Sequence, residues 1–327
     1  MLGSLHTLTL TFCRLGGGWA AAVGVLAPSL PGLRELSLAG NPDLLLEDTT
    51  AGGGNPEGDR GGGGAGGADF PLLSVLDLTN CGVGSWAAVE AVGARCPRLL
   101  SLTLDKNAKL ATLGRPEDRA FAEAAAAAAA AALVAKGGGA AAAVGGAAAD
   151  PQDAPGEVRD KALEESGAAG PLGQVAELGL EGCGVADWAE LLPLAARFPR
   201  LKGLAFTGNP CASGLDPKRF ARAVLPALPG LLSLSGAALL PGARAEAEDA
   251  FLVAALRTSA GEAANLLAGR TDEATAEGAV VIPTLGELGA MPGARSAMDK
   301  VLRAKHPHFF AVAARRGLPR AYLSLIE

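Results

Sequence analysis

Two stretches of the chain decide its fold: VAELGLEGC at 175–183 and LKGLAFTGN at 201–209. Both follow the pattern Leu-x-x-Leu-x-Leu-x-x-Asn/Cys, with Val175 replacing the first leucine in one and Phe206 replacing the third in the other. Four more copies occur at 5–13, 33–41, 73–81 and 99–107, and a degenerate copy contains Leu231 and Leu234. Six copies with one spacing are very improbable by chance, so the sequence predicts a repeated structural unit.

The spacing itself indicates how each copy folds. Side chains alternate between the two faces of a strand, so the second and third leucines point into a core and the residues between them point outward. The pattern is typical of leucine-rich repeats. We therefore predict an α/β leucine-rich-repeat solenoid whose parallel strands begin near Leu8, Leu36, Leu76, Leu102, Leu178 and Leu204 and line its concave face.

The last position of each copy alternates between cysteine and asparagine. The cysteines are Cys13, Cys81 and Cys183, and the asparagines are Asn41, Asn107 and Asn209. At the end of a strand such a group turns inward and can bond backbone groups that would otherwise lack partners. Because asparagine fills the same position in alternate copies, a structural role is favoured over a reactive or metal-binding thiol.

All three tryptophans follow a cysteine-type copy, at Trp19, Trp86 and Trp188. They could form a row that binds a ligand. Packing in the core at the turn from strand to helix is the preferred interpretation, since large aromatic side chains dominate the energetics of such cores.

The register breaks twice, at 47–69 and at 114–173, and both segments are rich in glycine or alanine. Neither can bury a core, so we expect disordered or loop insertions in a solenoid that spans 1–250. A helical C-terminal cap is predicted at 226–255, with Leu231, Leu234 and Leu239 inward and Arg244, Glu248 and Asp249 outward. Residues 256–327 are expected to form a partly disordered tail with a short helical segment at 298–317 and the possible start of a following domain.

Composition and motifs exclude several functional classes. The formal net charge is −6 and no basic stripe is present, which argues against nucleic-acid binding. No run of about 18 apolar residues suggests a membrane span, and no signal peptide is evident, so a cytoplasmic location is expected. The five cysteines form no CxxC pair, and His306 and His308 lack further ligand types nearby in sequence, so surface or packing roles are preferred over metal binding. No catalytic constellation is found, and we predict no enzyme activity, cofactor or metal.

A resemblance to a known family rests on the C-terminal part of the chain. Residues 231–251 resemble the end of the repeat domain of tubulin-folding cofactor E. The segment from His306-Pro307 to Pro319 resembles the His-Pro segment of that family, and Trp86 and Trp188 after their turns also resemble the family. The matching positions in the first stretch are Leu231, Leu234, Pro241, Arg244, Ala247, Glu248 and Phe251. Ser235 and Ala243 depart from the family pattern, which has Asn and Glu there.

The resemblance implies a chaperone that handles α-tubulin, together with other tubulin-folding cofactors, while the heterodimer is assembled or dissociated. It also implies a cytoplasmic protein associated with the cytoskeleton. The alternative is a generic leucine-rich-repeat scaffold or regulatory subunit in another cytoplasmic, axonemal or nuclear complex.

The outward strand positions carry acidic side chains and no Lys or Arg. The acidic residues are Glu35, Asp77, Asp105, Glu177 and Glu181. We interpret them as an acidic, shallow groove for a basic or neutral protein surface, since solenoids commonly bind partners on the strand side. A sheet face that is merely solvated is the alternative.

Overall fold

The computed structural model describes residues 4–16, 18–44, 69–112, 170–240, 242–267, 287–288, 291–319 and 322. The chain divides into two compact units. The first comprises Met1–Asp118, Asp150–Leu215 and Gly230–Leu239, and the second comprises Arg119–Ala149, Asp216–Pro229 and Leu240–Glu327.

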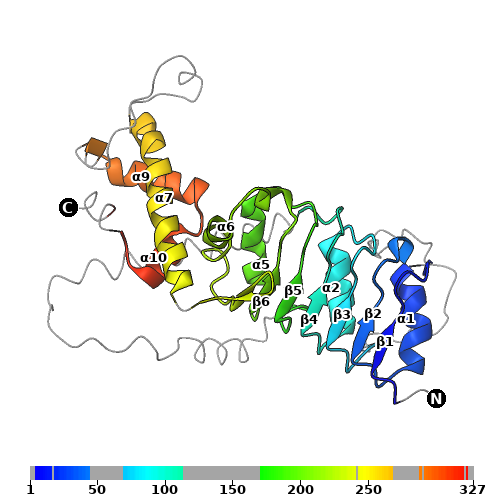
Figure 1. Cartoon of the computed structure of the whole chain (residues 1–327). Coiled ribbons are helices and arrows are strands. Elements are labelled where there is room, and N and C mark those ends of the chain that lie inside the picture. Colours follow the sequence, from blue (N-terminus) through cyan, green and yellow to red (C-terminus); the bar gives the residue numbers. More distant parts are fainter. Residues whose placement is uncertain are drawn as a thin grey trace, which may run out of the picture. The chain divides into compact units, whose positions relative to one another are not determined.

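The first unit is an α/β structure built on one eight-stranded, mostly parallel sheet, and Figure 1 shows its strands side by side in chain order. Strands β1 to β7 pair in parallel with their sequence neighbours, and only β8 is antiparallel, to β7. The strands are β1 (Thr7–Thr9), β2 (Glu35–Ser37), β3 (Val75–Asp77), β4 (Ser101–Thr103), β5 (Glu177–Gly179), β6 (Gly203–Ala205), β7 (Ser233–Leu234) and β8 (Ala237–Ala238). The predicted parallel strands are therefore confirmed.

The register of the sheet places the predicted core leucines opposite one another. Leu36 pairs with Leu76, Leu76 with Leu102 and Leu102 with Leu178, and each of these side chains is at most 2% exposed. β4 and β5 pair directly although the predicted insertion at 114–173 separates them in sequence. Since a slip of one residue would turn every core leucine toward solvent, burial of one face fixes this register.

Helices accompany the strands of the first unit along one side of the sheet in Figure 1. They are α1 (Gly18–Ser29), α2 (Trp86–Arg95) and α5 (Leu191–Arg197), with the short 3-10 turns η1 (Pro42–Leu44), η2 (Trp188–Glu190) and η3 (Pro210–Ala212). The Ser85 hydroxyl caps α2 by accepting a hydrogen bond from the Ala88 N–H, which satisfies a backbone donor at the helix start.

The asparagines at the strand ends bond backbone groups of two neighbouring strand segments. The side-chain oxygen of Asn107 accepts the N–H groups of Cys81 and Val83, each at 3.0 Å. Its amide nitrogen donates to the carbonyl oxygens of Leu78 and Leu104, at 2.9 and 2.7 Å. Each asparagine therefore ties the end of one strand to the next where regular pairing stops.

Asn41 and Asn209 repeat this arrangement two strands away from Asn107, one in each direction along the sheet. Asn41 donates to the carbonyls of Leu10 and Leu38, and Asn209 donates to those of Leu180 and Phe206. All three asparagines are at most 2% exposed, so their amides replace water for these backbone groups.

Two of the cysteines in the equivalent position are buried hydrogen-bond donors. The thiol of Cys81 donates to the Leu38 carbonyl at 3.1 Å, and that of Cys183 donates to the Leu104 carbonyl at 3.2 Å. Burial raises the pKa of each thiol to about 11. Such thiols stay protonated near neutral pH, which suits packing rather than nucleophilic chemistry. Cys13, in the first copy, is exposed.

The second unit is helical and contains α6 (Pro217–Val224), α7 (Ala243–Leu267), α9 (Ala294–Lys305) and α10 (Phe309–Arg316). Its core gathers side chains from α7, α9 and α10, among them Leu256, Met298 and Phe309. Among the described residues, no helix has both the length and the apolar character needed to cross a membrane.

The predicted segment boundaries differ from these elements in places. α7 continues to Leu267, well past the predicted cap boundary at residue 255. Of the predicted insertions 47–69 and 114–173, only residue 69 and residues 170–173 are described, so the expectation of disorder lies outside the described residues. Glu248 is 2% exposed, so the prediction that it faces outward is wrong.

We expect Asn107→Ala to lower the free energy of unfolding by about 1–3 kcal/mol or more, because the change leaves buried N–H and carbonyl groups without partners. Urea unfolding followed by circular dichroism measures the loss. Lys109→Ala, at an exposed position near the same turn, is the control and should change stability by less than about 0.5 kcal/mol. Equal stability of the two variants would contradict the role assigned to Asn107.

Candidate protein-binding site

The outward strand face consists of the strand residues that flank the buried leucines, together with the first residues after each strand. The five predicted acidic residues all lie on it: Glu35 begins β2, Asp77 ends β3, Glu177 begins β5, and Asp105 and Glu181 follow β4 and β5. All five side chains are partly or fully exposed. The sheet therefore brings together carboxylates that are up to about 150 residues apart in sequence, since its parallel strands stack in register.

Neutral donors hold most of these carboxylates in place. Asp77 accepts the Ser37 hydroxyl at 2.8 Å on one oxygen, and the N–H and hydroxyl of Thr79 at 3.0 and 2.7 Å on the other. Asp105 accepts the N–H of Glu181 at 2.7 Å. These bonds orient the carboxylates without neutralising their charge, so the face is preorganised and remains negative.

Two further hydroxyls continue the pattern on either side. The Thr7 hydroxyl donates to Glu35 at 3.1 Å, and the Thr207 hydroxyl donates to Glu181 at 2.6 Å. Each bond crosses from one strand segment to its neighbour, so it also contributes to pairing across the sheet.

Asp105 is partly buried and lies near other carboxylates, and both conditions raise its pKa. Partial burial raises the pKa of its carboxyl above the ordinary value, and the charges of Glu181 and Asp77 raise it further. The Glu181 N–H and the cation of Lys106 act in the opposite direction but do not reverse the shift. A cation brought to this part of the face would relieve that repulsion.

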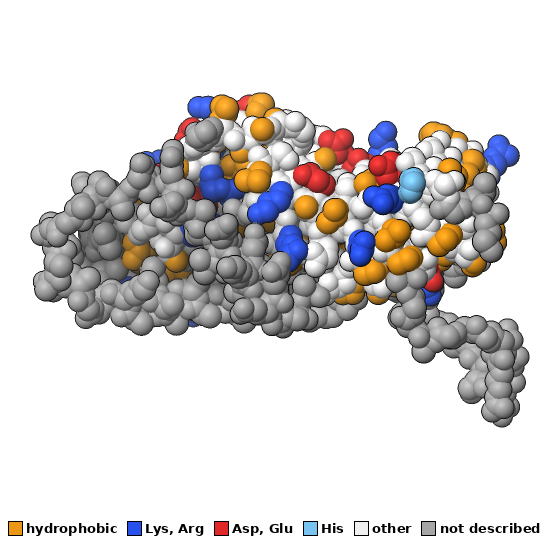
Figure 2. All heavy atoms as spheres, turned by 90° about the horizontal axis from the view of Figure 1, so that it is seen from below, with side chains coloured by type: hydrophobic (Ala, Val, Ile, Leu, Met, Phe, Trp, Pro, Cys, Tyr) orange, Lys and Arg blue, Asp and Glu red, His pale blue; other side chains and the backbone are white. Residues whose placement is uncertain are grey.

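In Figure 2, one side of the molecule shows Lys and Arg side chains interspersed with hydrophobic and acidic ones. The outward strand positions, by contrast, carry five acidic side chains and no Lys or Arg, because of the residue types that the sequence places between the core leucines.

A hollow of about 270 Å³ opens on the outward strand face over β4 to β7. Asp105 and Glu177 line it, together with the hydroxyl side chains of Ser101, Thr103 and Ser233. Its volume falls below the range of about 300–1,000 Å³ that is usual for sites of small molecules and cofactors. Its size and lining suit a single polar side chain.

The tryptophans occupy related positions at the start of the helical segments but differ in burial. Trp19 and Trp86 are 8% and 5% exposed, whereas Trp188 is partly exposed. Trp86 meets Phe198 edge-on at 5.8 Å and donates its indole N–H to the Thr112 carbonyl. Trp188 packs against Phe206 at 6.0 Å. These contacts fit the packing role expected for the tryptophans.

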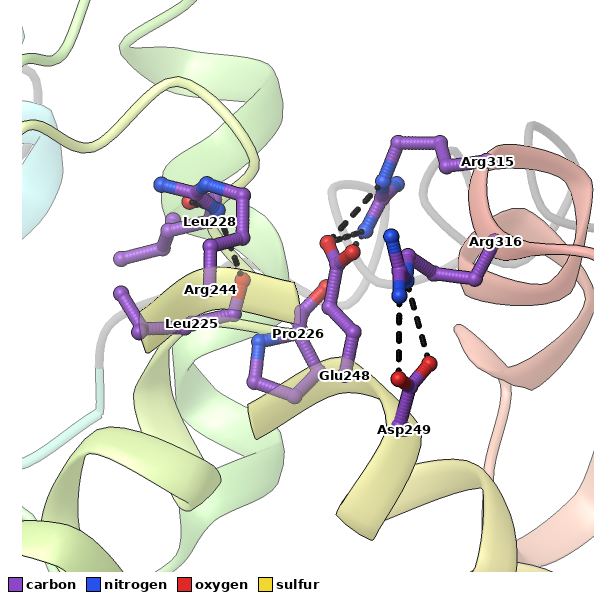
Figure 3. Close-up of polar contacts among 8 residues, drawn as sticks. All are labelled: Leu225, Pro226, Leu228, Arg244, Glu248, Asp249, Arg315 and Arg316. Atoms are coloured by element: carbon purple, nitrogen blue, oxygen red, sulfur yellow. Dashed lines mark hydrogen bonds and ion pairs between the residues drawn. The ribbon is translucent and has the colours of Figure 1, made fainter. Parts of the chain in front are cut away.

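In the second unit, the remaining predicted residues belong to a polar network shown in Figure 3. Glu248 of α7 is paired with Arg315 of α10 at 2.9 Å, and its side chain is only 3% exposed. Arg315 also donates to the Pro226 carbonyl at 3.3 Å. A buried carboxylate needs such a partner, so this pair fixes α10 against α7.

Arg244 and Asp249 complete the network. Arg244 donates to the carbonyls of Leu225 and Leu228, at 3.3 and 3.2 Å, just beyond the end of α6. Asp249 makes a two-point contact with Arg316, at 3.0 and 2.9 Å. Burial lowers the pKa of Arg244, yet an arginine with so high an ordinary pKa keeps its charge at neutral pH.

The two clustered histidines pack against α7. The ring of His308 stacks on Phe251 with centroids 4.3 Å apart, and His306 is hydrogen-bonded to the Thr258 hydroxyl at 3.1 Å. Burial lowers the pKa of His306, and it lowers that of His308 to about 3. Both rings are therefore neutral near pH 7 and act as packing groups.

Sequence reasoning missed three features of these sites. It did not pair Glu248 with Arg315, did not place Phe251 against His308, and did not find the hollow. The first two join residues that are far apart in sequence and carry no local pattern. A signal for the third was present: glycine occupies two outward strand positions, Gly179 and Gly203, where other strands have larger side chains.

We expect Glu248→Ala to lower the free energy of unfolding by about 1.5–3 kcal/mol, because the change removes a buried carboxylate that accepts charged hydrogen bonds from the partly exposed Arg315. Asp249→Ala, one residue further on the same helix, breaks an exposed pair and should cost about 0–1 kcal/mol. Thermal unfolding of the two variants makes the comparison. A cost for Asp249→Ala equal to or above that for Glu248→Ala would refute the ranking.

We also expect Asp105→Asn to be at least as stable as the unchanged chain at pH 7. The raised pKa of Asp105 means that its ionised form is disfavoured in the folded state. The stability cost of ionised Asp105 is complete when the pH is above the pKa of Asp105 in the folded chain, and it vanishes when the pH is below its pKa in the unfolded chain. The stability advantage of the asparagine variant should therefore disappear on acidification toward pH 3. Melting temperatures across this range test the sign, and an advantage that grew at low pH would contradict it.

The geometry as a whole describes a surface suited to noncovalent binding. The carboxylates and the neutral hydroxyls can accept hydrogen bonds from a cationic group, and the hollow beside them has room for one side chain. No protein-family model matches the sequence, and no curated protein matches it.

Proposed function

We propose that this chain is a protein-binding module, built as a leucine-rich-repeat solenoid, whose outward strand face receives the partner. The observation that carries the proposal is the row of oriented carboxylates on that face, together with the hollow between them. Charges fixed in advance speed the encounter with an oppositely charged surface and select against like-charged partners. A face that was merely solvated would not need four of its five carboxylates oriented by neighbouring donors, with three donors on Asp77 alone.

The proposed partner is α-tubulin, alone or with other tubulin-folding cofactors, and the proposed process is the assembly or dissociation of the tubulin heterodimer. This part rests on the resemblance to tubulin-folding cofactor E. Residues that carry the resemblance contact one another in the second unit: Glu248 pairs with Arg315, and Phe251 stacks on His308 beside the His306-Pro307 pair. Such contacts support the resemblance, since a motif shared by chance need not form one packed group.

The alternative is a scaffold or regulatory subunit that uses the same face for another protein. Nothing in the outward strand face is specific to tubulin, because acidic side chains accept any complementary basic surface. The distinction between the two therefore depends on a direct binding experiment.

The test is a pull-down of native tubulin with the immobilised chain, at low and at moderate salt. A variant in which Asp77 and Asp105 become asparagine and Glu177 and Glu181 become glutamine should recover at least about tenfold less tubulin at low salt, where surface charges are least screened. These changes keep oxygen acceptors on the face, so the fold should remain intact.

The control variant carries Asp43→Asn, Glu246→Gln, Asp249→Asn and Glu262→Gln, which gives the same change in net charge at residues that are not part of the outward strand face. It should recover tubulin like the unchanged chain. Equal recovery by both variants would remove the strand face from the proposal. Failure of the unchanged chain to recover tubulin, with folding verified by circular dichroism, would reject tubulin as the partner and favour the scaffold alternative.

A further inference from the structure

The hollow over β4 to β7 owes its depth to glycine. An added Cβ at Gly203 would lie 1.7 Å from the nearer carboxylate oxygen of Glu177, so the Glu177 side chain lies directly over the Gly203 backbone. An added Cβ at Gly179 would lie 2.8 Å from a carboxylate oxygen of Asp105. Side chains at these positions would push both carboxylates away from the sheet. Glycine on β5 and β6 therefore lets two carboxylates lie low beside the same hollow.

These two carboxylates retain capacity to accept hydrogen bonds. Among the described residues, the Glu177 side chain has no hydrogen-bond or ion-pair partner, although its backbone N–H donates to the Leu100 carbonyl. Asp105 uses one carboxylate oxygen for the Glu181 N–H. The hydroxyls of Thr103 and Ser233 add acceptors around the rim. The hollow thus offers several acceptors, two of them charged, and a floor that includes the small residues Gly179 and Ala205.

We propose that this hollow receives one arginine side chain from the partner protein, with its guanidinium between Asp105 and Glu177. The inference rests on the proposed function of the outward strand face and names the chemistry that this face recognises. Arginine presents five donors in a planar fork and is less strongly hydrated than lysine, so it suits a partly enclosed site with several acceptors. Two carboxylates on neighbouring strands can each accept hydrogen bonds from the arginine fork, whereas the ammonium group of lysine is a single point charge.

Size and ligand type separate this occupant from others. A hollow of about 270 Å³ accommodates one long side chain, and it is smaller than the sites that usually hold cofactors. Within the described part of the chain, no group of three His, Cys, Asp or Glu side chains is placed to hold a metal ion. The cation that fits is therefore a side chain, delivered by a protein that covers the surrounding strands.

The experiment titrates the full chain, labelled with ¹⁵N, with the capped peptide Gly-Ser-Arg-Ser-Gly, and follows the amide signals of Gly179, Gly203 and Gly236. The matched peptide contains citrulline, which is nearly isosteric with arginine but uncharged. We expect saturable shifts at these glycines, with binding of the arginine peptide about tenfold tighter than that of the citrulline peptide, the difference typical of a charge-assisted contact.

Two variants locate the binding. Glu177→Gln removes one charge, and Gly203→Ala displaces the Glu177 carboxylate without changing any charge on the chain. Each variant should bind the arginine peptide about three- to tenfold more weakly than the unchanged chain does. Gly170→Ala is the control, because an added Cβ there meets no atom within 4 Å, and it should bind like the unchanged chain. Circular dichroism and thermal unfolding verify that each variant folds.

Equal binding of both peptides, or unchanged binding by Gly203→Ala, would overturn the inference, because general electrostatic attraction would then suffice. The outcome is separable from that of the pull-down. Specific arginine binding by a chain that recovers no tubulin would support the hollow as an arginine site and reject tubulin as the partner. Tubulin recovery that depends on the four carboxylates, without a response to the arginine peptide, would support the outward strand face as the binding surface and reject the hollow as an arginine site.

Discussion

The hydrogen bonding of buried asparagines at the strand ends is the constraint on which the first unit depends. Each strand is only two or three residues long, so regular pairing stops almost as soon as it starts. The chain must then turn away while its N–H and carbonyl groups remain buried. Asn41, Asn107 and Asn209 bond these groups with both ends of their amides. Without that compensation, the cost of unpaired backbone would oppose the burial of the leucines.

The same arrangement leaves the other face of the sheet available for binding. Because the leucines and asparagines satisfy the packing and hydrogen-bonding requirements from one side, residues between the leucines carry little of the core energy. The outward positions can therefore hold carboxylates on some strands and glycines on others. Carboxylates provide charge, and glycines provide depth. The candidate site is the joint result of these two choices, and neither alone would produce a charged hollow.

The second unit follows a different physical principle. Its helices bury an apolar cluster, and one carboxylate, Glu248, is buried with them. A buried charge is tolerated because Arg315 neutralises it and reaches a backbone carbonyl as well. Such a pair adds less stability than apolar packing of similar volume would, but breaking it is costly. It therefore specifies which part of α10 meets α7.

The sequence alone determined the parallel strands and their register, because a strict spacing of leucines admits one buried face and a slip of one residue would expose it. It also indicated that Asn107 and Cys81 share one structural position, since the two residue types alternate there.

Only the tertiary structure decided which residues of different strands and helices meet: the Glu248–Arg315 pair, the His308–Phe251 stack, and the hollow between Asp105 and Glu177. These contacts join residues distant in the chain, and their formation depends on distances and directions that no local pattern encodes. Glu248 shows the difference, because a charged residue on a helix is usually exposed and only the placement of Arg315 makes its burial possible.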